Sequence, residues 1–238
     1  MFLISRRENV FRRAGFGFFS AMTLTLTVLT GRPALADPIN CEKVRTGTDP
    51  IRFTFTNTVE GAGKAPSQQV IYNDVVRSSP DGIVIFSYAG TTKYKSVISS
   101  NLIPLSIEVV GKTPARTITY DADISALSLS PGSTFAVNSI EEPVGGVSTM
   151  GHHDYSISDG GHFDLAGCSF PVLAVHHTTH YRRDKAEWDV TLDSLVSADL
   201  KVALHRKQTV VGLNLATPSS FTSVATDLST SADMTKAP

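Results

Sequence analysis

Short segments in which apolar and polar residues alternate recur from residue 51 to residue 215, and this recurrence restricts the fold more than any other feature. In the first of them Ile51, Phe53 and Phe55 fall on one side, as in a half-buried strand. Turn sequences such as Pro80-Asp81-Gly82 separate the segments, and none has a helical period. The sequence therefore predicts an all-β fold, a curved antiparallel meander that forms a half-barrel or barrel-like sheet.

The expected strands are short, and turns or loops are expected between them, including a turn at 159–161 and a loop at 193–198. Residues 217–238 are rich in Ser and Thr and are expected to form a disordered tail outside the fold. The single domain is thus expected to span residues 37–216. Its strands are expected at 51–59, 68–77, 83–89, 92–99, 102–110, 116–121, 134–140, 147–158, 167–183, 187–192, 199–207 and 210–215.

The segment 167–183 is expected to be the central strand, because β-branched and aromatic residues dominate it. Both of its faces begin apolar and end polar, as expected for a strand that leaves a covered core and ends at a wet rim. If the interior of the curved sheet stays open, this strand and the only tryptophan are expected to line an apolar cleft. The expected lining residues are Phe170, Val172, Leu173, Ala174, Val175, His176 and Trp188.

The first 36 residues have the pattern of an export signal. Arginines precede an apolar run over residues 14–30, and Ala34-Leu35-Ala36 is a small-x-small cleavage site. We expect cleavage after Ala36 and a soluble periplasmic or secreted protein with no integral membrane segment, because the run is too short and too polar to span a bilayer stably. Arginine pairs leave twin-arginine export open beside general secretion.

Two cysteines remain in the exported chain, Cys41 and Cys168, and an even count in an oxidising compartment predicts a disulfide between them. A redox role for free thiols is disfavoured because no Cys-x-x-Cys spacing occurs. Asn40 before Cys41 is not the small residue that a lipoprotein cleavage box requires, so no lipid anchor is expected.

Removal of residues 1–36 leaves a net charge of about −5, counted from the sequence. An acidic chain without a basic stripe is a poor ligand for nucleic acid, so no nucleic-acid partner is expected. The sequence indicates no oligomeric state.

Part of the chain resembles exported curved-sheet proteins of unknown function. The resemblance rests on Ser130-Pro131-Gly132 followed by Ser-Thr-Phe, on residues 155–161 and 165–170, on Trp188, and on residues 200–202. Such families form antiparallel half-barrels and are similar in outline to periplasmic lipoprotein carriers, whose concave face holds acyl chains. The resemblance implies this architecture and transfers no functional residue.

Three histidines in 167–183 would share a face if the segment were helical, and would then suggest a metal motif. In a strand His176 and His180 lie roughly 13 Å apart and His177 points to the opposite face, so the three cannot share one ion. We expect them to be rim residues hydrogen-bonded to Thr178, Thr179 and water, and we expect no cofactor. A metal site would need one of these three histidines together with residues from neighbouring segments, for example His152, His153, Asp154, His162 or Asp164.

No local catalytic signature is present, although a triad of His153, Asp154 and a distant serine remains open. Trp188, Tyr181 and Tyr155 could clamp a ligand, yet aromatics that alternate along strands more often form cross-strand pairs. Three classes of function follow, in order of preference: binding or carrying of a hydrophobic small molecule or lipid, a structural or envelope-interaction protein without a ligand, and a hydrolase with a non-local active site.

Overall fold

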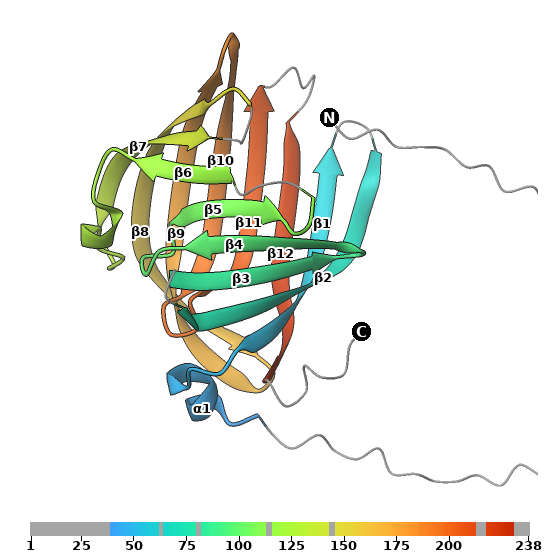
Figure 1. The fold of residues 1–238 in the computed structure, drawn as a ribbon. Coiled ribbons are helices and arrows are strands. Elements are labelled where there is room, and N and C mark those ends of the chain that lie inside the picture. Colours follow the sequence, from blue (N-terminus) through green and yellow to red (C-terminus); the bar gives the residue numbers. More distant parts are fainter. Residues whose placement is uncertain are drawn as a thin grey trace, which may run out of the picture. The chain divides into compact units, whose positions relative to one another are not determined.

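The computed structural model describes residues 39–61, 64–79, 82–112, 116–142, 146–212 and 218–230. Within these ranges twelve antiparallel strands form a closed barrel in the order β1-β12-β11-β10-β9-β8-β7-β6-β5-β4-β3-β2 (Figure 1). The all-β antiparallel prediction is therefore confirmed. The strands are β1 (Ile51–Gly61), β2 (Lys64–Ser79), β3 (Gly82–Ala89), β4 (Thr92–Ile98), β5 (Pro104–Val109), β6 (Arg116–Tyr120), β7 (Thr134–Glu142), β8 (Thr149–Leu165), β9 (Cys168–Arg183), β10 (Ala186–Ser197), β11 (Val202–Gly212) and β12 (Ser219–Thr230).

Two short helical segments accompany the strands, α1 (Cys41–Thr46) and the 3-10 turn η1 (Ile124–Ala126). The side-chain oxygen of Asn40 caps α1 by accepting a hydrogen bond of 2.9 Å from the backbone N–H of Lys43. A helix of six residues is too short to produce a readable apolar period, which explains why the sequence did not predict it. In the part of the chain that the structure describes, no helix is long and apolar enough to cross a membrane.

The last strand contradicts the expectation of a disordered tail from residue 217. Residues 219–230 form β12, which pairs with β1 along its whole length and with β11 on its other side. Ala225 and Leu228 are buried, so the apolar residues scattered among the serines and threonines are its core face. The barrel closes through this strand. Residues 231–238 and the expected cleavage site at Ala36 lie outside the described residues.

Several expected breaks are absent, because strands continue through them. The turn expected at 159–161 is a bulge inside β8, where the pairing with β9 shifts between Asp159 and His162. The loop expected at 193–198 is mostly the end of β10, and the two strands expected at 199–207 and 210–215 are continuous over residues 202–212, which form β11. Polar and glycine residues are tolerated there because a bulge or an outward face accommodates them.

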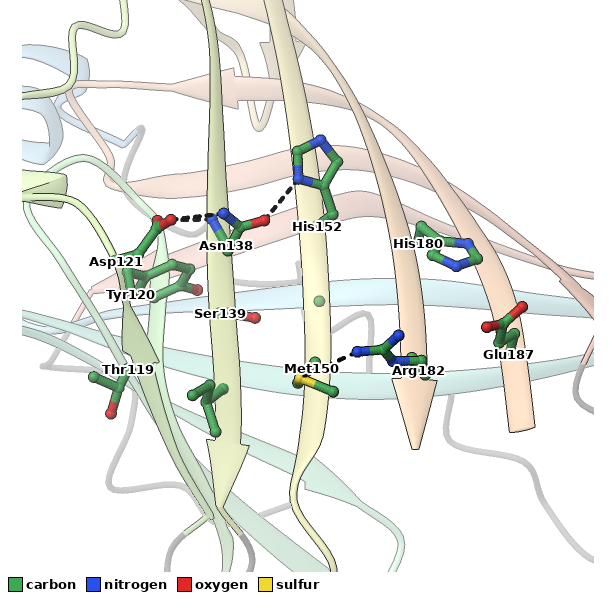
Figure 2. Close-up of a pocket in the computed structure, with 12 residues that line it drawn as sticks. Thr119, Tyr120, Asp121, Asn138, Ser139, Met150, His152, His180, Arg182 and Glu187 are labelled. Atoms are coloured by element: carbon green, nitrogen blue, oxygen red, sulfur yellow. Dashed lines mark hydrogen bonds between the residues drawn. The ribbon is translucent and has the colours of Figure 1, made fainter. Parts of the chain in front are cut away.

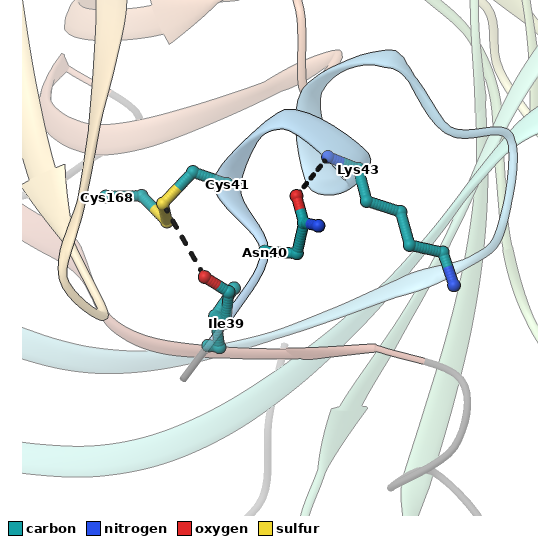
Figure 3. Close-up of a disulfide and its surroundings, with 5 residues drawn as sticks. All are labelled: Ile39, Asn40, Cys41, Lys43 and Cys168. Atoms are coloured by element: carbon teal, nitrogen blue, oxygen red, sulfur yellow. Dashed lines mark hydrogen bonds between the residues drawn. A yellow bond between two sulfur atoms is a disulfide. The ribbon is translucent and has the colours of Figure 1, made fainter. Parts of the chain in front are cut away.

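The main apolar cluster lies where α1 meets the barrel, near the turn between β8 and β9 (Figure 1). Cys41 of α1 is joined there to Cys168 of β9, with 5.6 Å between their Cα atoms (Figure 3). The predicted disulfide is confirmed, and it fixes the N-terminal segment against the cluster. The buried members are Val44, Ile51, Phe53, Phe55, Val75, Ile83, Ile98, Leu165, Cys168, Phe170, Val172, Leu200, Val202, Leu204, Ala225 and Leu228.

Burial decreases along β1 with distance from α1. Phe53 and Phe55 are 0% and 2% exposed, Asn57 is 7% exposed, and Val59 is 47% exposed, although all four alternate onto the same face. The barrel is therefore packed with apolar side chains at the α1 end and becomes more accessible toward the far end of β1.

Candidate functional site

The strand register identifies which side chains share the inner wall of the barrel. Directly opposite residues of antiparallel strands point to the same side, so one row can be followed from strand to strand. On β8 this side is buried at every second residue from Thr149 to Ile157, while the residues between are exposed. One inner row consists of Tyr155, His177, Leu192, Gln208, Phe221 and Val59, on β8, β9, β10, β11, β12 and β1.

A hydrogen-bonded group, which we call the inner histidine cluster, consists of Ser139, His153, His177 and Thr179. His153 Nε2 is hydrogen-bonded to Ser139 Oγ at 2.7 Å, and His153 Nδ1 lies 3.0 Å from both His177 Nε2 and Thr179 Oγ1. Thr179 Oγ1 is also 2.9 Å from His177 Nε2. Both nitrogens of His153 are thus satisfied inside the protein, as a buried polar group requires.

Aromatic rings extend this cluster in two directions. Tyr155 stacks on His177 with 4.0 Å between ring centroids, and Phe135, the neighbour of Tyr155 on β7, stacks on Tyr155 from its other strand at 4.6 Å. Tyr181 stacks on Trp188 at 5.3 Å. Tyr155, Tyr181 and Trp188 therefore do not form the single aromatic clamp that the sequence left open, because they belong to separate cross-strand stacks of the wall.

Both histidines of the cluster are held neutral. Burial, with a smaller contribution from the charge of His152, lowers the pKa of His153 to about 4. Burial lowers the pKa of His177 to about 3, with smaller contributions from His153, His176 and Arg206. Desolvation penalises the imidazolium form, so at neutral pH this part of the wall carries polar but uncharged rings.

Gly151 makes room for the cluster. A Cβ at this position would lie 2.8 Å from His153 Nε2, 2.9 Å from Ser139 Oγ and 3.1 Å from a ring carbon of Tyr181. A larger residue here would force His153 and Ser139 to move, since Cβ atoms in proteins essentially never lie within 3.0 Å of such groups.

Arg206 lies in the inner row next toward α1, opposite Ser194 on β10 and Ser223 on β12. Both serines are 8% exposed, whereas Arg206 is exposed to solvent. Surrounding protein nevertheless lowers the pKa of its guanidinium by burial, and its charge acts on the pKa of His177 across the interior. A side chain that is enclosed by protein and also reaches water projects into a water-accessible interior.

The outer face of β6–β10 carries a different feature, a groove with a volume of about 450 Å³ (Figure 2). A ladder of hydrogen bonds crosses it, from Asn138 Nδ2 to Asp121 Oδ2 at 2.6 Å and between His152 Nδ1 and Asn138 Oδ1 at 2.7 Å. Most of the residues that line it are charged or polar, although most of the surface that they present to the groove is apolar. The lining residues are Thr119, Tyr120, Asp121, Asn138, Ser139, Ile140, Met150, Gly151, His152, His180, Arg182 and Glu187.

The side chains expected to line a cleft are divided between different environments. Phe170 and Val172 are 0% and 3% exposed within the apolar cluster, so they offer no surface to a ligand. Val175, Leu173 and Trp188 are partly buried on the inner face, through pairing with Ser194, Val196 and Tyr181. Ala174 and His176 belong to a small outer groove of about 180 Å³.

The expected alternation of the three β9 histidines is confirmed. His176 and His180 are exposed on the outer face, where their Nδ1 atoms lie 2.7 Å and 2.8 Å from Asp193 and Asp189. His177 faces inward to Thr179. The predicted hydrogen bond between His177 and Thr179 is present at 2.9 Å, but His177 lies on the inner wall and not at a water-exposed rim, and it also contacts His153 there.

Within the described ranges no group of three His, Cys, Asp or Glu side chains is placed to hold a metal ion. His152 and Asp154 approach each other at 3.6 Å on the outer face, and His153 faces the interior. Asp164 pairs with Ser169, and His162 with Pro171, at the far end of the β8–β9 hairpin. The convergence that a site from these residues would need is therefore absent.

The triad left open by the sequence is not formed either. His153 does contact a serine, Ser139, but Asp154 points to the opposite face of β8. Ser139 and His153 are 3% and 4% exposed, so a substrate has no approach to the hydroxyl in this arrangement.

Sequence reasoning missed Ser139 and Arg206. Ser139 has no neighbours of catalytic type, and only the register of β7 with β8 brings it beside His153. Arg206 belongs to an alternating segment that predicted a half-buried strand, and its inward position would have been readable if β11 had been extended to residue 212 and paired.

Fold and site together define an antiparallel closed barrel with a water-accessible inner wall of mixed apolar and polar character. The sequence matches no protein-family model and no curated protein. Among solved structures it is similar to a hypothetical lipoprotein, YmcC, from Escherichia coli, with 12% sequence identity over 79% of this chain and 89% of that chain and a TM-score of 0.39. A similarity at this level carries no argument about function.

Proposed function

We propose that the barrel binds a hydrophobic small molecule or lipid in its interior. The observation that carries the proposal is the exposure of Arg206, an inward residue whose row neighbours Ser194 and Ser223 are buried. Water reaches this depth, so the interior has space that side chains do not fill. Such space, lined mostly by apolar groups with a few polar ones, is the common form of a small-molecule site.

Apolar side chains around Arg206 support a hydrophobic ligand. Leu192, Val210 and Phe221 face inward on β10, β11 and β12, and each is only partly buried. Apolar area that a ligand covers contributes roughly 25 cal/mol per Å². Of the lining residues expected from the sequence, Leu173, Val175 and Trp188 fit this proposal.

The outer groove is a weaker candidate for the same ligand. Its apolar members Ile140 and Met150 are 45% and 44% exposed, but Asp121, Arg182 and Glu187 surround them. A hydrophobic ligand there would cover apolar surface, but it would also desolvate the charged groups around it, which is unfavourable.

The disulfide indicates an extracytoplasmic protein, because such bonds persist in oxidising compartments. We place the protein in the periplasm or outside the cell, after cleavage behind Ala36. Intact-mass measurement of the protein from its own host tests this assignment. A mature chain that still contains residues 1–36 would contradict it.

The test of binding uses two adjacent valines as a matched pair. Val210 faces the interior, whereas Val211 is 48% exposed on the outer face. Titration of the full exported chain with the neutral fluorophore N-phenyl-1-naphthylamine should show saturable, stoichiometric enhancement. Val210→Trp should narrow the interior and weaken binding, and Val211→Trp should bind like the wild type.

The second candidate function is a structural or envelope-interaction role without a ligand. The packed α1 end of the barrel and the disulfide favour it, since both serve stability alone. A folded sample that gives no saturable fluorescence, or equal binding by the two tryptophan variants, would exclude an interior site and leave this second function.

A further inference from the structure

Arg206 is a cation without an anionic partner. Among the described residues it makes no ion pair and no side-chain hydrogen bond, whereas its neighbour on the outer face, Lys207, lies opposite Asp193. The surrounding wall lowers the pKa of Arg206 by burial, so water solvates this charge less well than a charge on the outer surface, and a carboxylate or phosphate is its usual partner in such a place. The barrel thus retains a guanidinium whose usual partner is not supplied by its own wall.

Glu141, an inward-facing acid that could have paired with Arg206, is already engaged. Glu141 forms an ion pair of 3.0 Å with Arg116, and it is hydrogen-bonded to the Tyr181 hydroxyl. The two histidines nearest in the wall are neutral at physiological pH and offer no negative charge. The interior around Arg206 therefore carries an uncompensated positive charge.

The side chains beside Arg206 in its own row are polar on β10, β12 and β1, and the row becomes apolar at Val175 and Ile157 on β9 and β8. Ser223 and Asn57 continue the Arg206 row across β12 and β1, and Asn57 Oδ1 is buried without a hydrogen-bond partner among the described residues. The next row away from α1 contains Leu192 and Phe221 on either side of Gln208. Polar groups beside Arg206, with apolar side chains within one row of it, match a molecule with a head group and a tail.

We infer that the interior ligand is an amphiphile with an anionic head group, a carboxylate or a phosphate, that pairs with Arg206 while its hydrocarbon part contacts Leu192 and Phe221. This inference rests on the proposed function, since it names the chemistry of the ligand of the same site. A guanidinium suits both head groups, because its fork of N–H donors matches two oxygens of either one.

The experiment compares three probes of equal chain length: dodecanoate, dodecyl phosphate and dodecan-1-ol. Each displaces N-phenyl-1-naphthylamine from the full exported chain, and the three dissociation constants are obtained under identical buffer conditions. We expect at least one anion to bind about tenfold or more tighter than the alcohol, the size of effect of a charge-assisted hydrogen bond. The dissociation constants of dodecanoate and dodecyl phosphate show whether the site prefers a carboxylate or a phosphate.

Arg206→Gln and Lys207→Gln form the matched variants, since each removes one positive charge from adjacent positions on opposite faces of β11. Arg206→Gln should lose the preference for the anion and bind dodecan-1-ol as the wild type does, which also shows that it is folded. Lys207→Gln should keep the preference. Rising salt should weaken anion binding to the wild type and leave alcohol binding unchanged.

The two proposals fail in different ways. If the fluorophore and all three probes bind wild type and Arg206→Gln equally, the anionic head group is overturned and the hydrophobic site stands. If no probe and no fluorophore binds, the interior site itself is overturned. An anion preference that survives Arg206→Gln would assign the head group to another residue and overturn the role of Arg206.

Discussion

Phe53 of the first strand lies opposite Leu228 of the last strand, and both side chains are buried. This pair belongs to the seam that closes the barrel, and it packs against the cluster beneath the candidate interior site. Although β12 consists mostly of serines and threonines, the barrel needs it for a complete core. Its few apolar residues pack with residues of β1 that lie about 175 positions earlier in the chain.

Truncation of Leu228 tests the seam. Leu228→Ala removes buried apolar atoms and leaves a cavity, so we expect the free energy of unfolding to fall by about 2 to 5 kcal/mol. Thr226→Ala, an exposed position on the same strand, should cost under about 1 kcal/mol. Urea denaturation followed by tryptophan fluorescence measures both, and equal effects would mean that β12 does not seal the core.

The disulfide should dominate the stability of the N-terminal segment. Cys41→Ser combined with Cys168→Ser releases a connection across 127 residues. In the chain-entropy description this costs about 4 to 5 kcal/mol. Thermal unfolding should show the same decrease when the wild type is reduced, and reductant should not affect the double variant. Two thiols that react with an alkylating agent in unreduced, unfolded protein would refute the bridge.

Acid should destabilise the barrel through the inner histidine cluster. The folded-state pKa values of His153 and His177 are lowered, so the unfolded chain binds more protons as the pH falls below about 6.5. Stability is therefore complete above that pH and decreases toward the folded pKa values near 4 and 3. Between pH 7 and pH 5 we expect a loss of about 2 to 4 kcal/mol from the pair.

The matched variants for the acid effect are His177→Gln and His176→Gln, adjacent residues on opposite faces of β9. Urea midpoints across the pH series should depend less on pH in His177→Gln than in the wild type. His176→Gln, which changes only an exposed side chain, should retain the wild-type slope. If the urea midpoints of both variants depend on pH as strongly as those of the wild type, the acid effect does not arise from the inner histidine cluster.

Gly151→Ala should disturb the inner wall without altering any hydrogen-bonding group. The added methyl meets His153, Ser139 and Tyr181 at 2.8 to 3.1 Å, so we expect destabilisation of about 1 to 3 kcal/mol. Gly61→Ala is the control, because its added carbon would lie at an ordinary 3.7 Å from Ser219 Cβ. Near-ultraviolet circular dichroism should change only for Gly151→Ala, whose neighbours include a tyrosine ring.

Much of this fold was readable from local patterns. Alternation fixed the faces of β1 and β9, and the cysteine count with the export pattern identified the disulfide. The pattern failed where a strand carries glycines through a bulge, as at Gly160 and Gly161, and where a core strand is mostly hydroxylated, as in β12. In both cases partner strands, not local propensity, decide the structure.

The site was less predictable, because it depends on register. His153 was recognised as a candidate, but its partner Ser139 comes from another strand, and the inward position of Arg206 follows from its pairing with two buried serines. A single inserted residue in either strand would move these side chains to the opposite face. The register that places these side chains on the inner face therefore cannot be read from the local sequence.

Closure between the first and last strands also sets the timing of folding. Thr226 donates to the backbone of Thr54 across 172 residues, so the seam forms only after nearly the entire chain is available. Contacts of such sequence separation require large loops to close first, and proteins dominated by them fold slowly. Until β12 pairs with β1, β1 presents an unpaired strand edge that can pair with another chain. Folding without aggregation therefore requires either that a chaperone covers this edge or that the barrel closes rapidly.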